Sequence, residues 1–436
     1  MEREDLSYLP LRALGLALFR GTLDRPAGRD FVLLLELLAR EHPKPAEVAD
    51  TFGRLWEELA VDSGDLLPDA WQSYLVERIL DDENPFSLGA ERGGPGTSVI
   101  EQARRDLRTL QALFEVEARP LLDLVESAVP GLRVWVPWTD PNLENEGSHR
   151  GAVARELAAA EDWGACAELL ADYYARHGAG HFNRCRAFRW RDGDLYPVAN
   201  PDAVRPDQLI GYEDEREPLL KNTERFVAGL PAHHALLYGL PGTGKSSTVK
   251  AVANAYADRG LRLVELAKED LGSLPQVLDV LRDRGLRFIV FVDDLSFEEH
   301  EVQYKSLKAL LEGSVEEPPE NVRLYATSNR RNIIRENFSD RNEAGPVGDD
   351  VHARDTMQEK LSLGARFGLR VTFPTPDQKR YLEIVEGLVR ERRIDIPEEA
   401  VTERALLWDR WHAGRSGRTA RQFVDELEAE LLEQSL

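Results

Sequence analysis

One short segment of the chain has the composition of a phosphate-binding loop. Residues 239–246 read GLPGTGKS, follow the apolar run ALLYG and precede the helical pattern KSSTVKAVANAYA. They fit the pattern G-x-x-x-x-G-K-[ST], in which glycines let backbone N–H groups converge on an anion at the N-terminus of a helix. We expect Lys245 to bind the β- and γ-phosphates and Ser246 to contact Mg²⁺. The predicted nucleotide-binding residues of this loop are Gly239, Leu240, Pro241, Gly242, Thr243, Gly244, Lys245, Ser246 and Ser247.

A second element supplies carboxylates. The run RFIVFVDDLSF contains an apolar strand pattern that ends at Asp293 and Asp294. An aspartate that ends a strand is common on solubility grounds alone. Its place after a phosphate loop in an alternating strand and helix pattern favours a functional role, in which Asp293 holds Mg²⁺ directly or through water.

The elements that must position these residues follow an α/β rhythm from Leu209 onward. Short continuous apolar runs predict strands that are buried on both faces, and helical patterns lie between them. The expected strands are ALLYG, LRLVEL, FIVFV, VRLYATS and LRVTF. The predicted fold class is therefore α/β, with a five-stranded parallel sheet of the phosphate-loop NTPase type.

The remaining segments read as helices, which gives four expected regions. Residues 1–180 form a mostly helical N-terminal domain, because apolar residues recur at three- and four-residue spacing. Residues 181–208 form a hairpin-like segment around Asp192-Gly193 and a linker. Residues 209–375 form the α/β module, and residues 376–436 form a C-terminal helical lid.

The composition excludes some classes of protein. The chain of 436 residues carries a formal net charge of −23, which repels nucleic acid and acidic membranes unless basic residues cluster locally. No run approaches the roughly 20 apolar residues of a membrane helix. The N-terminal residues begin acidic and include Arg12, unlike a secretion signal, so we expect a cytoplasmic protein. Cys166 and Cys185 are then expected as free thiols.

From Leu209 to the C-terminus, the chain resembles the AAA+ ATPases. GLPGTGKS, IVFVDD, YATSN, GARFGL and GRTAR occur in the order typical of that superfamily. LIGYEDEREPLLKNTERF, FVDDLSFEE, YKSLKALLEG and EKLSLGARFGL are more closely similar to a bacterial family of predicted AAA+ ATP-binding proteins that is defined by a domain of unknown function. The resemblance implies ATP and Mg²⁺ as ligands and ATP hydrolysis as the reaction.

The resemblance also implies roles for individual residues. Asn329 corresponds to sensor 1, which orients the attacking water. Arg366 corresponds to an arginine finger that reaches the γ-phosphate of a neighbouring subunit. Arg421 corresponds to sensor 2, with Arg418 as the alternative. The implied catalytic set is Asp294, Asn329, Arg366 and Arg421.

The resemblance has two further implications, one for the binding of adenine and one for the residue that activates water. Leu209 and Ile210 lie in the segment that lines the adenine pocket of AAA+ proteins. Asp294 stands where most AAA+ ATPases have the glutamate that polarises water. The shorter side chain favours slow hydrolysis, or assistance from Glu298 or Glu299.

Three functions remain open from the sequence. The first is an ATPase that remodels or loads an unknown protein partner. The resemblance to AAA+ proteins implies that it assembles as a ring or spiral of about six subunits. The second is a slow nucleotide-gated switch or scaffold. The third is a nucleic-acid remodeller, suggested by the mixed arginines and aromatics of residues 181–193 and by Arg330, Arg331 and Arg335, but disfavoured by the net charge.

His181 and Cys185 lack the further ligands of a zinc site, so no metal besides Mg²⁺ is expected.

Overall fold

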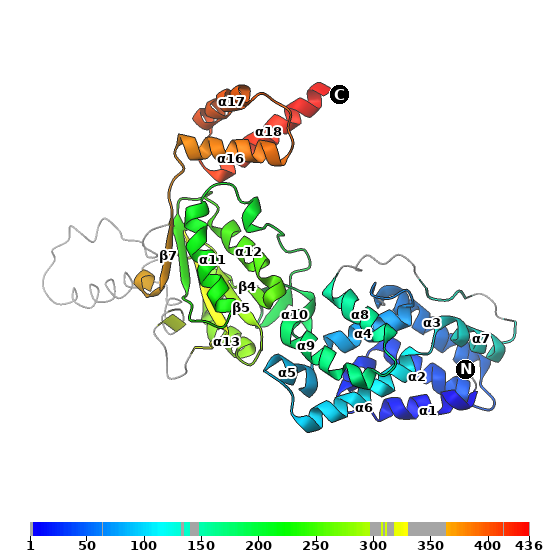
Figure 1. Ribbon diagram of the computed structural model, residues 1–436. Coiled ribbons are helices and arrows are strands. Elements are labelled where there is room, and N and C mark those ends of the chain that lie inside the picture. Colours follow the sequence, from blue (N-terminus) through cyan, green and yellow to red (C-terminus); the bar gives the residue numbers. More distant parts are fainter. Residues whose placement is uncertain are drawn as a thin grey trace, which may run out of the picture. The chain divides into compact units, whose positions relative to one another are not determined.

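The computed structural model describes residues 3–62, 64–131, 135–139, 148–296, 307, 310–311, 318–329, 363–412 and 414–435. Contacts divide the chain into two compact units (Figure 1). The first unit comprises Met1–Arg184 and Arg284–Leu286, and the second comprises Cys185–Asp283 and Arg287–Leu436.

The first unit is helical. Its α-helices are α1 Arg3–Leu14, α2 Pro26–Ala39, α3 Pro45–Asp62, α4 Ala70–Asp81, α5 Pro85–Glu91, α6 Thr97–Phe114, α7 Ala118–Ala128, α8 His149–Ala159, α9 Ala167–His177 and α10 His181–Arg184. Their apolar faces share one core, in which the rings of Phe31 and Trp71 stack at 3.5 Å between centroids. Asp69 caps α4 by accepting the N–H groups of Trp71 and Gln72, as the N-terminus of a helix requires.

The second unit contains a seven-stranded sheet. Its strands are β1 Ala187–Arg191, β2 Asp194–Pro197, β3 Ala235–Gly239, β4 Leu261–Glu265, β5 Arg287–Val292, β6 Val322–Ser328 and β7 Leu369–Phe373. The spatial order is β2-β1-β4-β5-β6-β3-β7, and every pairing except that of β1 with β2 is parallel. The five predicted strands are β4, β5, β6, β3 and β7, which lie side by side in this order. Their parallel pairing confirms the predicted parallel α/β fold.

The hairpin β1–β2 belongs to the same sheet. Asp192 and Gly193 both have positive φ, 52° and 86°, which suits the two-residue turns that match the twist of a hairpin. β1 then pairs in parallel with β4, and Phe188 lies opposite Val264. The hairpin that the sequence predicts therefore widens the five-stranded sheet to seven strands.

Helices cover the sheet and build a lid. α11 Glu213–Val227, α12 Lys245–Ala255 and α13 Leu274–Arg282 contact its strands. Tyr325 of β6 anchors α11, because its buried hydroxyl bonds to Asn222 at 3.0 Å and to Thr223 at 2.7 Å. The lid consists of α16 Gln378–Glu391, α17 Glu398–Trp411 and α18 Gly417–Ser435 (Figure 1). No helix in the described ranges is long and apolar enough to cross a membrane.

Candidate active site

The phosphate loop leaves the carboxyl end of β3 and opens α12. A Cβ atom at Gly239 would lie 2.1 Å from the carbonyl oxygen of Phe373 in β7, so only glycine lets the two strands approach this closely. Gly242 and Gly244 have φ of 80° and 87°, a conformation that side chains disfavour. This geometry turns the chain directly into α12, whose first N–H groups have no acceptor within the helix.

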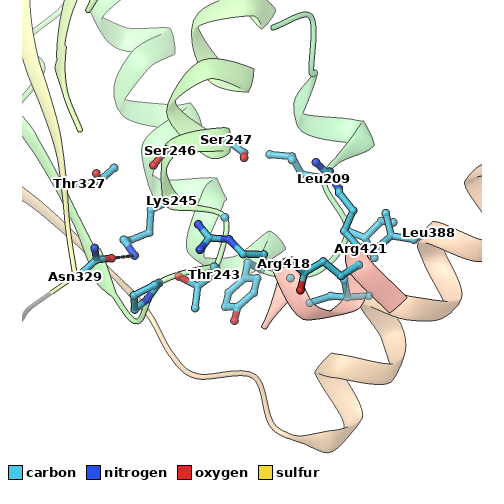
Figure 2. A pocket seen from close by; sticks show the side chains of 18 of the residues that line it. Leu209, Thr243, Lys245, Ser246, Ser247, Thr327, Asn329, Leu388, Arg418 and Arg421 are labelled. Carbon is cyan, nitrogen blue, oxygen red and sulfur yellow. Dashed lines mark hydrogen bonds between the residues drawn. The ribbon is translucent and has the colours of Figure 1, made fainter. Parts of the chain in front are cut away.

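Lys245 is buried at the start of α12. Its ammonium donates hydrogen bonds to the carbonyl oxygens of Gly239 at 2.8 Å and Leu240 at 2.9 Å. It donates a third to Oδ1 of Asn329 at 3.1 Å (Figure 2). Burial lowers the pKa of the ammonium, while the nearby Asp294 and Asp293 act in the opposite direction. The lysine thus carries its charge in a partly desolvated position, where an anion gains most from it.

Ser246 and Asp293 form an oxygen site beside the lysine. The Ser246 hydroxyl donates to Oδ1 of Asp293 at 2.7 Å, which brings the loop to the end of β5. A hydroxyl and a carboxylate are the hard oxygen ligands that Mg²⁺ prefers, and Mg²⁺ usually keeps several waters besides. The two residues therefore fit a Mg²⁺ ion that also binds phosphate oxygens.

Asp294 and Asn329 lie across from the loop. The amide nitrogen Nδ2 of Asn329 donates to Oδ1 of Asp294 at 2.7 Å, while its amide oxygen accepts from Lys245. Asp294 has φ of 48°, an unusual value for a residue with a side chain. The structure thus brings the lysine, both aspartates and the asparagine into one hydrogen-bonded group.

These residues line a pocket of about 610 Å³ that extends from the loop to the lid. The volume lies in the range of small-molecule sites. At the lid end, the pocket is lined by Leu209 and Ile210 and by Ile384 and Leu388 of α16. This apolar end fits a planar base, while the loop end fits phosphates.

The lid reaches the phosphate loop through the start of α18. The N–H of Gly417 donates to the carbonyl oxygen of Gly242 at 2.8 Å. A Cβ at Gly242 would lie 3.0 Å from Oγ of Ser416, so the two segments touch closely. Arg418 and Arg421 both line the pocket, and Figure 2 shows Arg418 extending toward the loop near Thr243 and Arg421 toward Leu209.

The structure places the other predicted residues as follows. Gly239 and Leu240 do not line the pocket, and they contribute carbonyl oxygens to Lys245. Arg366 ends the short helix η7 Leu363–Arg366 and is not among the residues that line the pocket of its own chain. The alternative bases Glu298 and Glu299 and the basic residues Arg330, Arg331 and Arg335 lie outside the described residues.

Several lining residues were not predicted from the sequence. Thr327 lies near the end of β6, two positions before Asn329, which directly follows that strand, and this closeness to a predicted site residue was the available signal. The rest come from segments far from the loop in sequence, and their patterns show only ordinary helix or turn positions. They are Gln208, Tyr212, Ile384, Leu388, Gly417, Gln422 and Asp425.

The stretch of mixed arginines and aromatics does not expose its rings. Phe188 and Trp190 are each 2% exposed, and Arg189 on the same strand pairs with Glu265 at 2.9 Å. Stacking on bases requires open ring faces. The part of this stretch that forms β1 is an amphipathic strand whose aromatic side packs inward, and the preceding residues form α10. No group of three or more His, Cys, Asp or Glu side chains that could hold a metal occurs in the described part of the chain.

Comparison with known proteins adds the family. Residues 183–431 match a family model described as "Protein of unknown function (DUF815)". The proteasome-activating nucleotidase of Methanocaldococcus jannaschii is 27% identical over 214 residues, which cover 46% of this chain and 46% of that protein. A 26S proteasome regulatory subunit 4 homolog of Encephalitozoon cuniculi is 41% identical over 96 residues, covering 20% of this chain and 23% of that protein.

These likenesses have a limited span. The chain covers less than half the length of the archaeal nucleotidases that it matches. Solved structures of the RuvB Holliday junction branch migration motor of Thermotoga maritima are 17% identical, with a TM-score of 0.37, over 53% of this chain and 66% of that one. A TM-score this low carries no argument about this chain. The family model, in contrast, matches more than half of the chain. The chain therefore belongs to the family described as Protein of unknown function (DUF815), within the AAA+ superfamily of phosphate-loop ATPases.

Proposed function

We propose that this protein binds Mg·ATP in the pocket and hydrolyses it in order to remodel or load a macromolecular partner. The observation that carries the proposal is the convergence of Lys245, the Ser246–Asp293 pair and the Asp294–Asn329 pair at one end of a pocket whose other end is apolar. That combination suits a triphosphate at one end and a base at the other.

The residues have separable tasks in this proposal. The ammonium of Lys245 exchanges its carbonyl and amide acceptors for β- and γ-phosphate oxygens and stabilises their charge. The carboxylate of Asp294 accepts a proton from the attacking water, and the amide of Asn329 holds that carboxylate in place. Ser246 and Asp293 would hold Mg²⁺, which would supply a Lewis acid to neutralise charge on the phosphates.

Assembly and location belong to the same proposal. Arg366 lies outside the pocket of its own chain, which suits a residue that reaches the γ-phosphate in the neighbouring subunit of a homo-oligomeric ring or spiral. The helical first unit is the part available to recognise a protein partner in the cytoplasm.

A slow nucleotide-gated switch is the second candidate, and Asp294 favours it. Aspartate is one methylene shorter than glutamate and is held by Asn329, so it reaches less far toward a water at the γ-phosphate. Steady-state phosphate release, with and without cell extract, separates the candidates. A motor is stimulated by its partner to many turnovers, whereas a switch stays slow and changes only what it binds.

Two substitutions test the proposed function. Mg·ATP should raise the melting temperature of the wild type and not of Lys245→Ala, because a ligand at a hundredfold its Kd stabilises the folded state by about 2.7 kcal/mol. Asp294→Asn should keep that shift and lose phosphate release, because it removes the base and leaves the phosphate loop intact.

A lysine on the same helix provides the control. Lys250 lies in α12 but does not line this pocket, so Lys250→Ala should behave like the wild type. Equal melting shifts in the wild type and Lys245→Ala would remove Lys245 from the site. Undiminished phosphate release by Asp294→Asn would assign the base to another residue.

A further inference from the structure

Thr327 of β6 contacts three consecutive residues of the acidic element. Its hydroxyl donates to Oδ1 of Asp293 at 2.5 Å and accepts the backbone N–H of Asp294 at 2.9 Å. Its carbonyl oxygen accepts the N–H of Leu295 at 2.7 Å. Thr327 as a whole is only 1% exposed, yet it lines the pocket. We call this arrangement the threonine clamp.

The hydroxyl satisfies two partners that need opposite things. The carboxylate of Asp293 requires a donor, and the N–H of Asp294 requires an acceptor. A hydroxyl provides one proton and free lone pairs, so it serves both at once, whereas a methyl group of the same size serves neither. The identity of the side chain at position 327 therefore bears on both aspartates together.

The clamp also makes the two carboxylate oxygens of Asp293 different, because in the described part of the chain one accepts hydrogen bonds and the other does not. Oδ1 accepts from Ser246 at 2.7 Å, from Thr327 at 2.5 Å and from the N–H of Asp294 at 3.1 Å. Within the described residues, no hydrogen bond to Oδ2 is recorded. With Oδ1 held by three donors, the carboxylate cannot rotate freely, and Oδ2 is the oxygen whose lone pairs remain for a cation.

Asp294 depends on the same strand. A positive φ is uncommon for a residue with a side chain, although aspartate tolerates it better than most, and the surrounding contacts select it. Here the end of β6 and the residue that follows it supply the restraints, because Thr327 accepts the N–H of Asp294 and Asn329 donates to its carboxylate. Thr327 lies near the end of β6 and Asn329 directly follows that strand, so both reach the acidic element from the same end of the sheet.

We propose that Thr327 is a positioning residue that orients Asp293 toward the metal and Asp294 toward the attacking water. This inference rests on the proposed ATPase function, since it assigns the geometry of that site to a residue that touches neither phosphate nor water. A purely structural threonine would contribute to stability alone and would leave the dependence on metal unchanged.

Two matched pairs of substitutions isolate the hydroxyl. Thr327→Val keeps the size of the side chain and removes the hydroxyl. Thr327→Ser and Thr327→Ala both remove the methyl group and differ only in the hydroxyl, so they remain informative if the valine variant does not fold. Melting temperatures without nucleotide measure the effect of each change on folding.

The deciding measurement is the Mg²⁺ concentration at which a fluorescent ATP analogue is half bound, measured for each protein at fixed nucleotide. We expect Thr327→Val and Thr327→Ala to need about tenfold more Mg²⁺ than the wild type, a change typical of a charged group that loses a hydrogen bond. Thr327→Ser should stay within about threefold of the wild type. Where turnover is measurable, kcat should fall about tenfold or more in the first two variants, with KM for ATP little changed.

The possible outcomes distinguish a failure of the proposed role of Thr327 from a failure of the proposed ATPase function. A wild type that binds Mg·ATP without hydrolysing it contradicts the ATPase but leaves the Mg²⁺ comparison intact. Equal Mg²⁺ dependence in Thr327→Ala and Thr327→Ser overturns the clamp, because the hydroxyl is then irrelevant. A wild type whose nucleotide binding ignores Mg²⁺ overturns both.

Discussion

The ring of His234, the residue before β3, accepts a hydrogen bond at Nδ1 from the backbone N–H of Leu324 at 2.9 Å. Burial lowers its pKa to about 4, and the nearby Arg323 adds to the effect. The folded protein therefore holds this imidazole neutral at a pH where the unfolded chain, with a pKa near 6.5, is already protonated. Stability from this group is complete above pH 6.5 and is lost as the pH falls toward 4.

His234→Asn should remove that acid sensitivity. An asparagine has an amide oxygen in reach of the position of Nδ1 and does not titrate. Between pH 7 and pH 5, the free energy of unfolding of the second unit should fall by about 2 kcal/mol more in the wild type than in the variant. Denaturant unfolding at both pH values measures the difference, and parallel losses in the two proteins would mean that His234 is not the titrating group.

At the residue scale, the sequence predicted the local half of the site. The loop from Gly239 to Ser247 has a fixed pattern, and Asp293 and Asn329 each follow an apolar strand, so the topology of a parallel sheet brings them to one edge. Ile384 and Leu388 could not be predicted in this way. They are ordinary apolar positions of a helix, and only the folding of the lid turns them toward the pocket.

At the scale of elements, the hairpin shows the same division. Asp192-Gly193 predicted a tight turn, since both residues tolerate positive φ. The pairing of β1 with β4 was not predicted, because it joins segments that are far apart in the sequence and depends on which edge of the sheet is open. Local chemistry thus specified the turn, whereas tertiary packing specified the partner.

The contact between α18 and the phosphate loop can be tested by a backbone change. Gly417 is the first residue of α18, a position where proline is compatible with a helix. Proline there would remove the N–H that bonds Gly242 and would also place a ring carbon against that carbonyl oxygen. Gly417→Ala adds a Cβ at the same place, 3.0 Å from the Gly242 carbonyl oxygen, and keeps the N–H. The pair therefore compares a lid that keeps its bond to the loop with one in which that bond is lost and the contact is crowded.

We expect Gly417→Pro to bind Mg·ATP at least about fivefold more weakly than Gly417→Ala, because the loss of one neutral hydrogen bond alone weakens binding by about that factor and the proline ring adds crowding at the loop. The reason is that the lid then closes over the nucleotide without its bond to the loop. Equilibrium binding of a fluorescent ATP analogue measures the ratio. Equal affinities in the two variants would show that the lid and the loop are coupled by packing instead.

At the scale of the whole molecule, the proposed assembly depends on Arg366. An arginine that stabilises charge on a transferred phosphoryl group contributes about 10³–10⁵ in rate, and lysine replaces it poorly. If Arg366 acts on the neighbouring subunit, Arg366→Ala should bind ATP and fold normally yet barely turn over. Phosphate release and melting temperature of the purified variant measure both properties.

Mixing then tests whether the arginine acts in trans. Arg366→Ala and Lys245→Ala are each expected to be inactive alone, but an oligomer assembled from both contains some interfaces with an intact loop and an intact arginine. Activity should therefore return in the mixture. Inactive oligomers that demonstrably contain both variants, or a wild type fully active as a monomer, would make Arg366 a residue of its own site.

The pairing of β1 with β4 bears on how this protein can be shortened. A chain cut at Leu209, where the nucleotide-binding pattern begins, would lose both hairpin strands and leave the backbone of β4 open along one side. Phe188 and Trp190 would leave with them, and an uncapped strand invites pairing with other molecules. A fragment intended for crystallisation or binding studies should therefore begin no later than Cys185, so that the hairpin still pairs with β4 and covers that edge of the sheet.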